Sequence, residues 1–465
     1  MHDVLQYLKE NHEHFVDLLR QQVAVPSIST DGAHAAEIDQ SANVVADQMR
    51  QAGLEGVEIL RFQDSYPYVY GEWCHAPGKP TVFLYSHHDV QPCNTGGWES
   101  DPWVLTRRNG RLYGRGAADD KGGTVAQLAS IQAWLKTQGT LPVNVKVLVE
   151  GEEEIGSKNL QGFFNAYRNK IKSDVIVVTD TGNLQAGLPC LTYSLRGIVE
   201  LIVEVQTLKQ AVHSGEGGGT LPDAAIALNV ILSRLYAHQK KYPIPNFYDQ
   251  VRKLTAKELA GFKALPFDEK KYRKESALLP GLELVTPKGM HVLEQKWRQP
   301  AITIIAQEAS SFKQKSNQVL PSARAILSVR IVPDMKPKDV FKTLKAVLTK
   351  DPPYGCKVNV TLSEHMVDWW MTDPTGPAFD ACMQALAAGF GKKPHAIGCG
   401  GSIGFVGPLA KLFGGAPALL IGIEDPMSQP HSQNESLNEG EFTKVMASLA
   451  HLYHHLGNLP GGKVK

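Results

Sequence analysis

Hydrophobic positions near the start of the chain recur at helical spacing. Five apolar residues fall on one face of a predicted helix: Leu5, Leu8, Phe15, Leu18 and Leu19. Because proline cannot continue a helix, the segment VAVPSIS is expected to end this first helix at Pro26. A second helix is predicted over residues 35–52.

Continuous apolar runs follow, separated by helical stretches. They cover residues 82–85, 143–149, 174–178 and, much later, 418–423. Strands that are buried on both faces have this unbroken apolar character, whereas strands with one solvated face alternate. The pattern therefore predicts a mostly parallel sheet that is covered by helices.

The middle of the chain has a different pattern. The alternation typical of strands with one solvated face is predicted in VELIVEV (199–205) and ARAILSVRI (323–331), and an apolar helix is predicted over 222–236. The charged stretch 253–275 is interpreted as a solvated helical face. The predicted fold is α/β: a mixed, mostly parallel sheet formed by residues 1–190 and 376–465, interrupted by a smaller α+β domain with an antiparallel sheet at 191–375.

Composition narrows the class of protein. A chain of 465 residues is long enough for two domains, and 48 Lys and Arg against 47 Asp and Glu give no electrostatic basis for binding nucleic acid or an anionic membrane. The six cysteines are scattered, which indicates reduced thiols. The first residues carry acids and lack an apolar core, so neither a signal peptide nor a membrane anchor is expected. These features together predict a cytoplasmic protein.

Polar clusters follow the predicted strands at their C-terminal ends, where open α/β sheets bind ligands. The clusters contain His87 with Asp89, Glu152 to Glu154, Asp180, and His431. Asp119 and Asp120 precede a further helix, in the segment LYGRGAADDKGG. Taken singly, each cluster has an ordinary explanation: a charge at a helix N-terminus, a solvated turn or a loop histidine. Their coincidence at one edge of one sheet favours a binding site, and the adjacent carboxylates of Glu152 to Glu154 need cations.

The chain resembles the M20 family of dinuclear metallopeptidases, especially its dipeptidase branch of cytosolic non-specific and carnosine-type enzymes. Six segments match the family motifs in order: SHHDVQP, LYGRGAADDKGG, EGEEEIGS, VVTDTG, VHSG and HSQNE. They extend from residue 86 to residue 435.

This resemblance implies roles for individual residues. His87 and Asp180 would hold one metal ion, Glu154 and His431 a second, and Asp119 would bridge both. Glu153 would be the general base, and Asp89 would orient His87. Substrate would contact His213, Asn317, Arg330, Gly401 and Ser402. The family's metals are generally zinc, with manganese or cobalt in some members, and its inserted domain acts as a lid and usually as a dimerisation domain.

The chemistry of these side chains fits such roles. Imidazole and carboxylate donors without thiolate suit zinc or manganese at an exchangeable site. A water that bridges two divalent ions loses its proton near neutral pH, and Glu153 could accept that proton and pass it to the leaving amine. His213 could donate to the oxyanion, and Arg330 could bind a substrate carboxylate. For Arg330, a salt bridge on an outward-facing strand is an equally good interpretation of the spacing.

Two departures from the family pattern concern substrate choice. Dipeptidases of this type commonly have an acidic residue before the glycine pair of the late Gly-rich loop, where this chain has Cys399 in GCGGS. The sequence therefore leaves open whether the substrate needs a free α-amine. The segment DTGN after Asp180 also lacks the aromatic residue that is often found in the carnosine-dipeptidase branch. Cys399 has no adjacent His/Asn pair, so a core thiol is the preferred interpretation.

The favoured hypothesis is a dinuclear metal-dependent hydrolase that cleaves the peptide bond of dipeptides with a metal-bridging hydroxide and Glu153 as base. An N-acyl amino acid deacylase or a carboxypeptidase of the same family is the alternative, and a non-catalytic dimeric binding protein is a third. A homodimer is expected through the inserted domain, because its helix 222–236 has more apolar surface than one small sheet requires. His213 would then serve the partner's site; the alternative is that it serves only its own chain.

Overall fold

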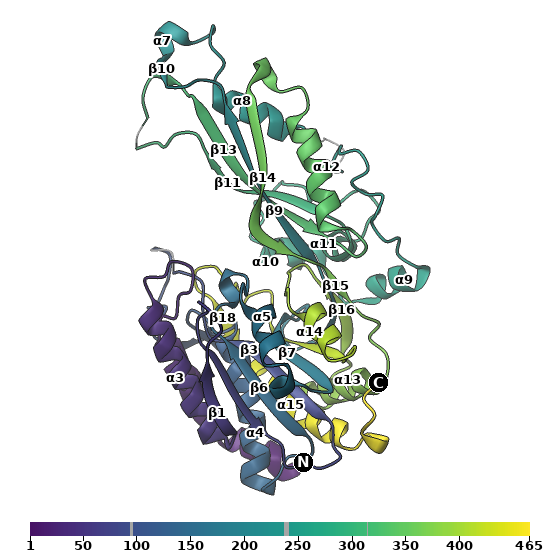
Figure 1. The fold of residues 1–465 in the computed structure, drawn as a ribbon. Helices are drawn as coiled ribbons and strands as arrows, with labels where there is room; N and C mark the ends of the chain where they lie inside the picture. Colours follow the sequence, from purple (N-terminus) through teal and green to yellow (C-terminus); the bar gives the residue numbers. More distant parts are fainter. Residues whose placement is uncertain (94–95, 237–240, 314) are drawn as a thin grey trace.

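The computed structural model describes residues 1–93, 96–236, 241–313 and 315–465. Two sheets define a large domain, which contains both termini, and a small domain, which projects from it (Figure 1). No helix among these described residues is long and apolar enough to cross a membrane.

A nine-stranded sheet forms the centre of the large domain. Its strands run in the order β1 (Glu55–Leu60), β2 (Tyr68–Trp73), β6 (Asn144–Glu150), β3 (Thr81–His87), β7 (Val175–Gly182), β17 (Ala418–Glu424), β8 (Cys190–Leu195) and β15 (Trp370–Met371), and β16 (His395–Cys399) pairs with β8. The central strands β6, β3, β7 and β17 are parallel, as is the β16–β8 pair, and the outer strands are antiparallel. The predicted mixed α/β sheet is confirmed.

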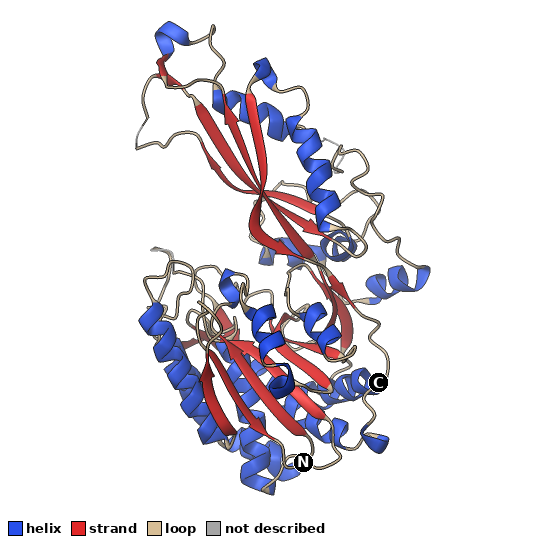
Figure 2. Cartoon of the chain, viewed as in Figure 1, coloured by secondary structure: helices blue, strands red, loops and turns tan. Residues whose placement is uncertain are grey.

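Helices cover both faces of this sheet (Figure 2). One face packs against α1 (His2–Glu10), α2 (His12–Val23), α3 (Ala35–Ala52), α4 (Lys121–Gln138), α13 (Pro377–Phe390) and α15 (Glu439–Gly457). The other packs against α5 (Leu160–Ala166) and α14 (Val406–Leu412), and the short α6 (Arg168–Ile171) follows α5. In β3, Val82 and Leu84 join the first core whereas Phe83 and Tyr85 join the second. Burial on both sides explains the unbroken apolar runs in the sequence.

The first predicted helix is wrong as a single element. The structure has two helices, α1 and α2, which meet at Asn11. Asn11 has a non-helical backbone (φ −102°, ψ 19°), and its side-chain amide donates to the carbonyl of Tyr7 at 2.9 Å. An asparagine that bonds the preceding turn in this way competes with the helical ladder. The helix predicted over residues 35–52 is confirmed as α3.

The start of α4 lies very close to strand β7. A Cβ atom added to Gly123 would lie 2.5 Å from the carbonyl oxygen of Thr179 and 2.0 Å from Oδ1 of Asp120. No other residue fits there without displacing backbone. The glycine therefore lets the helix approach the sheet, and the residues just before the helix reach the ends of the strands.

The small domain has a four-stranded antiparallel sheet in the order β11 (Ala301–Glu308), β13 (Ser322–Ile331), β9 (Gly197–Gln206) and β14 (Lys357–Val367). Helices α8 (Ala224–Ser233) and α12 (Pro337–Thr349) pack on one face (Figure 2). At its far end β10 (Val212–His213) pairs with β12 (Gln318–Val319) beside α7 (Ser214–Gly217). The alternation predicted for β9 is confirmed in its burial: Val199, Leu201, Val203 and Val205 are buried, and the less buried Glu200, Ile202 and Glu204 lie between them.

Three short helices lie between α8 and β11 in the chain: α9 (Ala256–Ala264), α10 (Glu269–Glu275) and α11 (Val292–Arg298). The stretch 253–275, interpreted as one solvated face, is two helices separated at Pro266, and its Phe262 and Leu265 are buried near Trp297. A three-stranded sheet of β18 (Ser436–Asn438), β5 (Arg111–Tyr113) and β4 (Thr106–Arg108) completes the large domain.

Sheet pairing locates the crossings between the domains. The chain leaves the large sheet after β8, at Leu195, and re-enters it at Trp370 in β15. Both strands therefore pair within the large sheet, a few residues inside the segment 191–375 that the sequence assigns to the insertion. Leu191 and Leu195 pack in the two cores of the large domain, which explains why β8 stays there.

Candidate metal centre

The ends of the parallel strands bring the predicted polar residues together. Strand β3 ends at His87, β7 carries Asp180 near its end, and β6 leads directly into Glu152, Glu153 and Glu154. Asp119 reaches the same edge from the loop before α4, and His431 from the loop that links β17 to β18. This is the edge at which open α/β sheets bind ligands.

Five side chains form two groups that share Asp119. His87, Asp119 and Asp180 place one ligand atom each within 4.8 Å of one another, and so do Asp119, Glu154 and His431. Nε2 of His87 lies 2.9 Å from Oδ1 of Asp119. Nε2 of His431 lies 3.0 Å from Oδ2 of Asp119 and 3.2 Å from Oε2 of Glu154. Each oxygen of Asp119 therefore faces a different group.

Asp89 links His87 to the turn that carries the glutamates. Nδ1 of His87 lies 3.0 Å from the carbonyl oxygen of Asp89 and 3.5 Å from its Oδ1. The same carboxylate accepts hydrogen bonds from the backbone amides of Glu153 at 3.1 Å and Glu154 at 3.0 Å, and from the hydroxyl of Ser29 at 2.7 Å. Asp89 thus orients two parts of the cluster, of which the sequence indicated only one.

The three adjacent glutamates have different environments. Oε1 of Glu152 accepts hydrogen bonds from Tyr68 Oη at 2.6 Å and from the amide of Asn159 at 2.9 Å, so the expectation that all three need cations is wrong for this residue. Glu153 and Glu154 face the cavity instead. Burial, together with the charges of Glu154 and Asp119, raises the pKa of Glu153 to about 8. Such a carboxyl is poised to exchange a proton near neutral pH.

The remaining carboxylates repel one another. Burial and the neighbouring Asp120 raise the pKa of Asp180 well above its usual range, and burial and Asp119 raise the pKa of Glu154. Although burial opposes it, hydrogen bonds with His431 and His87 hold the pKa of Asp119 well below its usual range. A buried set of carboxylates and imidazoles that contains no thiolate fits divalent cations such as zinc or manganese.

A buried ion pair supports the loop before Asp119. Oε2 of Glu435 lies 2.6 Å from Nη1 of Arg115 and accepts the amide of Gly116 at 3.0 Å. Oε1 accepts the amides of Ala118 at 3.0 Å and Asp119 at 3.2 Å. Sequence reasoning missed this support, although Glu435 ends the segment HSQNE and Arg115 lies in LYGRGAADDKGG.

A cavity of about 610 Å³ opens onto the cluster from between the two domains. Its lining includes Arg330 from the small domain, together with Gly401 and Ser402. Nη1 of Arg330 donates to Oγ of Ser402 at 2.7 Å. Because no acidic side chain of the described residues pairs with Arg330, the salt-bridge interpretation loses its basis. Gln91, whose amide donates to Oε2 of Glu154 at 2.9 Å, and Glu424 also line this cavity and were not predicted.

His213 and Asn317 lie elsewhere. The carbonyl of Asn317 accepts the amide of Ser214 at 2.8 Å, and the exposed His213 accepts the amide of Gly215 through Nδ1 at 3.0 Å. The segment β10–α7 that carries His213 forms the far end of the small domain (Figure 1). The structure therefore brings these two residues near each other but not into the cavity of their own chain.

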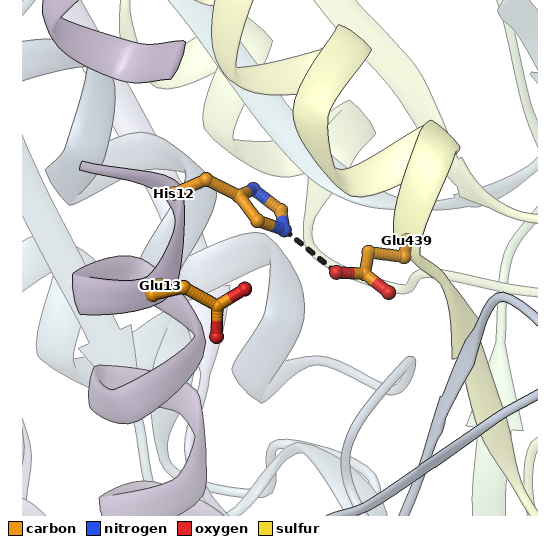
Figure 3. Close-up of side chains that lie close together, drawn as sticks. All are labelled: His12, Glu13 and Glu439. Carbon is orange, nitrogen blue, oxygen red and sulfur yellow. Dashed lines mark hydrogen bonds and ion pairs between the residues drawn. The ribbon is translucent and has the colours of Figure 1, made fainter. Parts of the chain in front are cut away.

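A third group of possible ligands, His12, Glu13 and Glu439, joins α2 to α15 (Figure 3). Nε2 of His12 lies 2.8 Å from Oε1 of Glu439. Nη2 of Arg107 lies 2.7 Å from Oε1 of Glu13 and 2.9 Å from Oε1 of Glu439. Because the guanidinium of Arg107 pairs with both carboxylates and His12 pairs with one of them, this group is an ion-pair network at the surface.

Comparison with known proteins agrees with this geometry. Residues 83–455 match the family described as peptidase family M20/M25/M40. The chain is 31% identical to the cysteinylglycine-S-conjugate dipeptidase of Corynebacterium striatum over 94% of each chain, and 29% identical to the Cys-Gly metallodipeptidase dug1 of Schizosaccharomyces pombe over 97% of each. The crystal structure of human carnosine dipeptidase 1 superposes with a TM-score of 0.88 at 28% identity, over 98% of each chain. The chain therefore belongs to peptidase family M20/M25/M40.

Proposed function

We propose that this peptidase is a dinuclear dipeptidase, in which His87, Asp119 and Asp180 hold one divalent ion and Asp119, Glu154 and His431 hold another. The observation that carries the proposal is the position of Asp119, whose two oxygens face two separate groups of ligands. The dipeptidase relatives support the choice of substrate.

Zinc is the proposed metal, with manganese or cobalt as substitutes, because the donors are imidazole and carboxylate. Two divalent ions at this site would polarise the scissile carbonyl and lower the pKa of the attacking water. Their charge would also offset the carboxylates of Asp119, Asp180 and Glu154, whose mutual repulsion is otherwise costly in a buried site.

The protein's own residues would then move the proton and hold the substrate. Glu153 accepts the proton of the attacking water and returns it to the leaving amine, as its position in the cavity and its raised pKa allow. Asp89 holds His87 and the turn that carries Glu153 in place. Arg330, with Gly401 and Ser402 beside it, binds the α-carboxylate of the substrate.

The oxyanion donor is proposed to be His213 of a partner subunit, with Asn317 beside it. Dimerisation through the small domain is supported by two unpartnered surfaces on it. The outward face of α8 exposes Ile226 (56%) and Val230 (44%). Strand β11, whose outer edge pairs with no strand of the described residues, exposes Ile305 (53%). Free strand edges and clustered apolar side chains favour association between subunits.

A cytoplasmic location is part of the proposal. The six cysteines are free thiols, and three of them are buried: Cys190, Cys356 and Cys382. Disulfides are rare in a reducing compartment, so free thiols fit the cytoplasm.

One activity screen tests the proposed reaction. The metal-loaded protein is assayed against free dipeptides, amino-blocked dipeptides and N-acyl amino acids. Cleavage of dipeptides supports the proposal, whereas exclusive cleavage of N-acyl amino acids would make the chain a deacylase, and turnover of none would favour a non-catalytic binding protein. Because Cys399 supplies no fixed carboxylate for the substrate amine, amino-blocked dipeptides should be cleaved at rates comparable to free ones. Strict dependence on a free amine would assign that role to another residue.

A further inference from the structure

A second cavity adjoins the proposed substrate site. It has a volume of about 490 Å³ and lies where α10 and α11 approach the loop that follows β16. Four residues line both cavities: Gly182, Cys399, Gly401 and Glu424. The second cavity therefore continues the first beyond the loop 399–402.

Two cations face this second cavity around Gly400. Nε of Arg196 donates to the carbonyl of Gly400 at 2.9 Å, and its backbone amide donates to Gly401 at 3.0 Å. A Cβ atom added to Gly400 would lie 3.1 Å from Nη2 of Arg196 and 3.5 Å from Cε of Lys296. The absence of a side chain at residue 400 thus leaves the ends of both basic residues accessible from the cavity.

Neither cation has an acidic partner among the residues that the structure describes. Most acids of the cavity wall are engaged: Glu275 lies 3.6 Å from Lys271, Asp425 lies 2.8 Å from Arg111, and Asp268 accepts the amide of Lys270 at 2.8 Å. Glu424 lies on the side shared with the metal centre.

The loop between Arg196 and Arg330 explains why both remain unpaired. Cys399 lies in this loop close to both guanidinium groups and provides no carboxylate to either of them. Burial and the nearby charge of Arg330 lower the pKa of Arg196 to about 10, which still leaves it protonated at neutral pH. Two unpaired guanidiniums on either side of one loop suit a ligand with two carboxylates.

We propose that this second cavity is a subsite for a second carboxylate on the C-terminal side of the scissile bond, bound by Arg196 and Lys296. This inference rests on the proposed dipeptidase function, in which Arg330 binds the α-carboxylate. The second carboxylate is either the side chain of a C-terminal Asp or Glu, or the terminus of a longer peptide. The enzyme then prefers acidic C-terminal residues over their neutral isosteres.

The test compares isosteric substrates on the metal-loaded, full-length enzyme. The value of kcat/KM should be about tenfold higher for Ala-Glu than for Ala-Gln, because a charge-assisted hydrogen bond typically contributes a free energy that corresponds to this ratio. Arg196→Gln and Lys296→Gln should each reduce this ratio toward one, mainly through KM. Lys270→Gln is the matched control, because Lys270 is exposed and does not line the cavity. Ala-Ala-Ala against its C-terminal amide distinguishes a longer peptide from an acidic side chain.

The outcomes separate this inference from the proposed function. If Ala-Ala is cleaved but kcat/KM for Ala-Glu equals that for Ala-Gln, the subsite is overturned and the dipeptidase activity is supported. The same conclusion holds if both variants leave the ratio of the two kcat/KM values unchanged. If no dipeptide is cleaved, calorimetry with Ala-Glu and Ala-Gln decides: tighter binding of Ala-Glu that Lys296→Gln removes supports the subsite, and equal affinities overturn it. Because Lys296 is exposed on α11, its variant decides the matter even if Arg196→Gln does not fold.

Discussion

Oδ1 of Asp119 lies 2.9 Å from Nε2 of His87, and this contact leaves the second oxygen of the same carboxylate free to face His431. A side chain that belongs to two ligand groups couples them, so its loss should affect both ions. Asp119→Ala should reduce the metal content from two ions per chain to less than one. Elemental analysis after exhaustive dialysis measures this.

Glu439→Gln serves as the control for metal content, because Arg107 already pairs with both carboxylates of the group His12, Glu13 and Glu439, which should therefore bind no ion. Its metal content should equal that of the wild type. A saturating stoichiometry of one ion, with affinity intact in Asp119→Ala, would contradict a dinuclear site.

Glu153→Gln should lower kcat by about 10²- to 10⁴-fold, because the amide keeps the size of the side chain but cannot accept a proton. Metal content should be largely retained. Steady-state kinetics and elemental analysis of the same preparation measure both. Turnover close to the wild-type value would assign the base to another residue.

Glu152→Gln is the matched control, because the carboxylate of Glu152 accepts hydrogen bonds from Tyr68 and Asn159 and does not face the cavity. This variant should keep its kcat and lose about 1–3 kcal/mol of unfolding free energy, the cost of weakening buried hydrogen bonds. If Glu152→Gln loses catalysis and keeps its stability, Glu152 rather than Glu153 would be the general base.

Arg115→Met should destabilise the protein strongly, because it leaves the carboxylate of Glu435 buried without its cation. Removal of one partner of a buried pair costs about 3–5 kcal/mol. Metal affinity should fall as well, since Glu435 holds the backbone of Asp119. Denaturant unfolding and metal titration measure the two effects.

Arg108→Met is the control for that variant. Arg108 lies 3.4 Å from the exposed Glu99, and an exposed pair of this kind contributes about 0–1 kcal/mol. Equal destabilisation by both variants would mean that burial of the Arg115–Glu435 pair is not what stabilises the loop.

The strand ends could be predicted from sequence because burial on both faces leaves an unbroken apolar run. Val82 to Tyr85 marks β3, and the polar residues that follow such runs must converge wherever the strands are parallel. The position of Asp119 has a local cause too, since only a glycine at 123 allows α4 so close to β7.

Contacts between distant segments were not predictable in the same way. Arg115 and Glu435 are 320 residues apart, and neither residue by itself indicates a partner. The hydrogen bonds of Glu152 depend on the positions of Tyr68 and Asn159 in the folded chain, and the spacing of apolar residues in the sequence does not predict these positions. The break at Asn11 depends on a single side-chain bond to the preceding turn, within a pattern that is otherwise helical.

Strand β10, which ends at His213, lies at the far end of the small domain (Figure 1). If His213 serves the partner's site, Glu153→Gln and His213→Ala chains are each inactive alone but complement each other when mixed. In a mixed dimer, the chain that retains Glu153 receives the partner's intact His213, so one of two sites works. Random pairing of equal amounts then restores about one quarter of the sites. Activity after dissociation and reassociation of the mixture measures this.

A mixture of Glu153→Gln with Asp119→Ala is the matched control, because both residues lie in the large domain of one chain and no pairing can rebuild a complete site. This mixture should stay inactive. If mixed dimers of the first pair are verified by mass and also stay inactive, His213 does not act across the subunit boundary. Full activity of His213→Ala alone would remove it from the reaction altogether, and the oxyanion donor would then have to come from the residues that line the cavity itself.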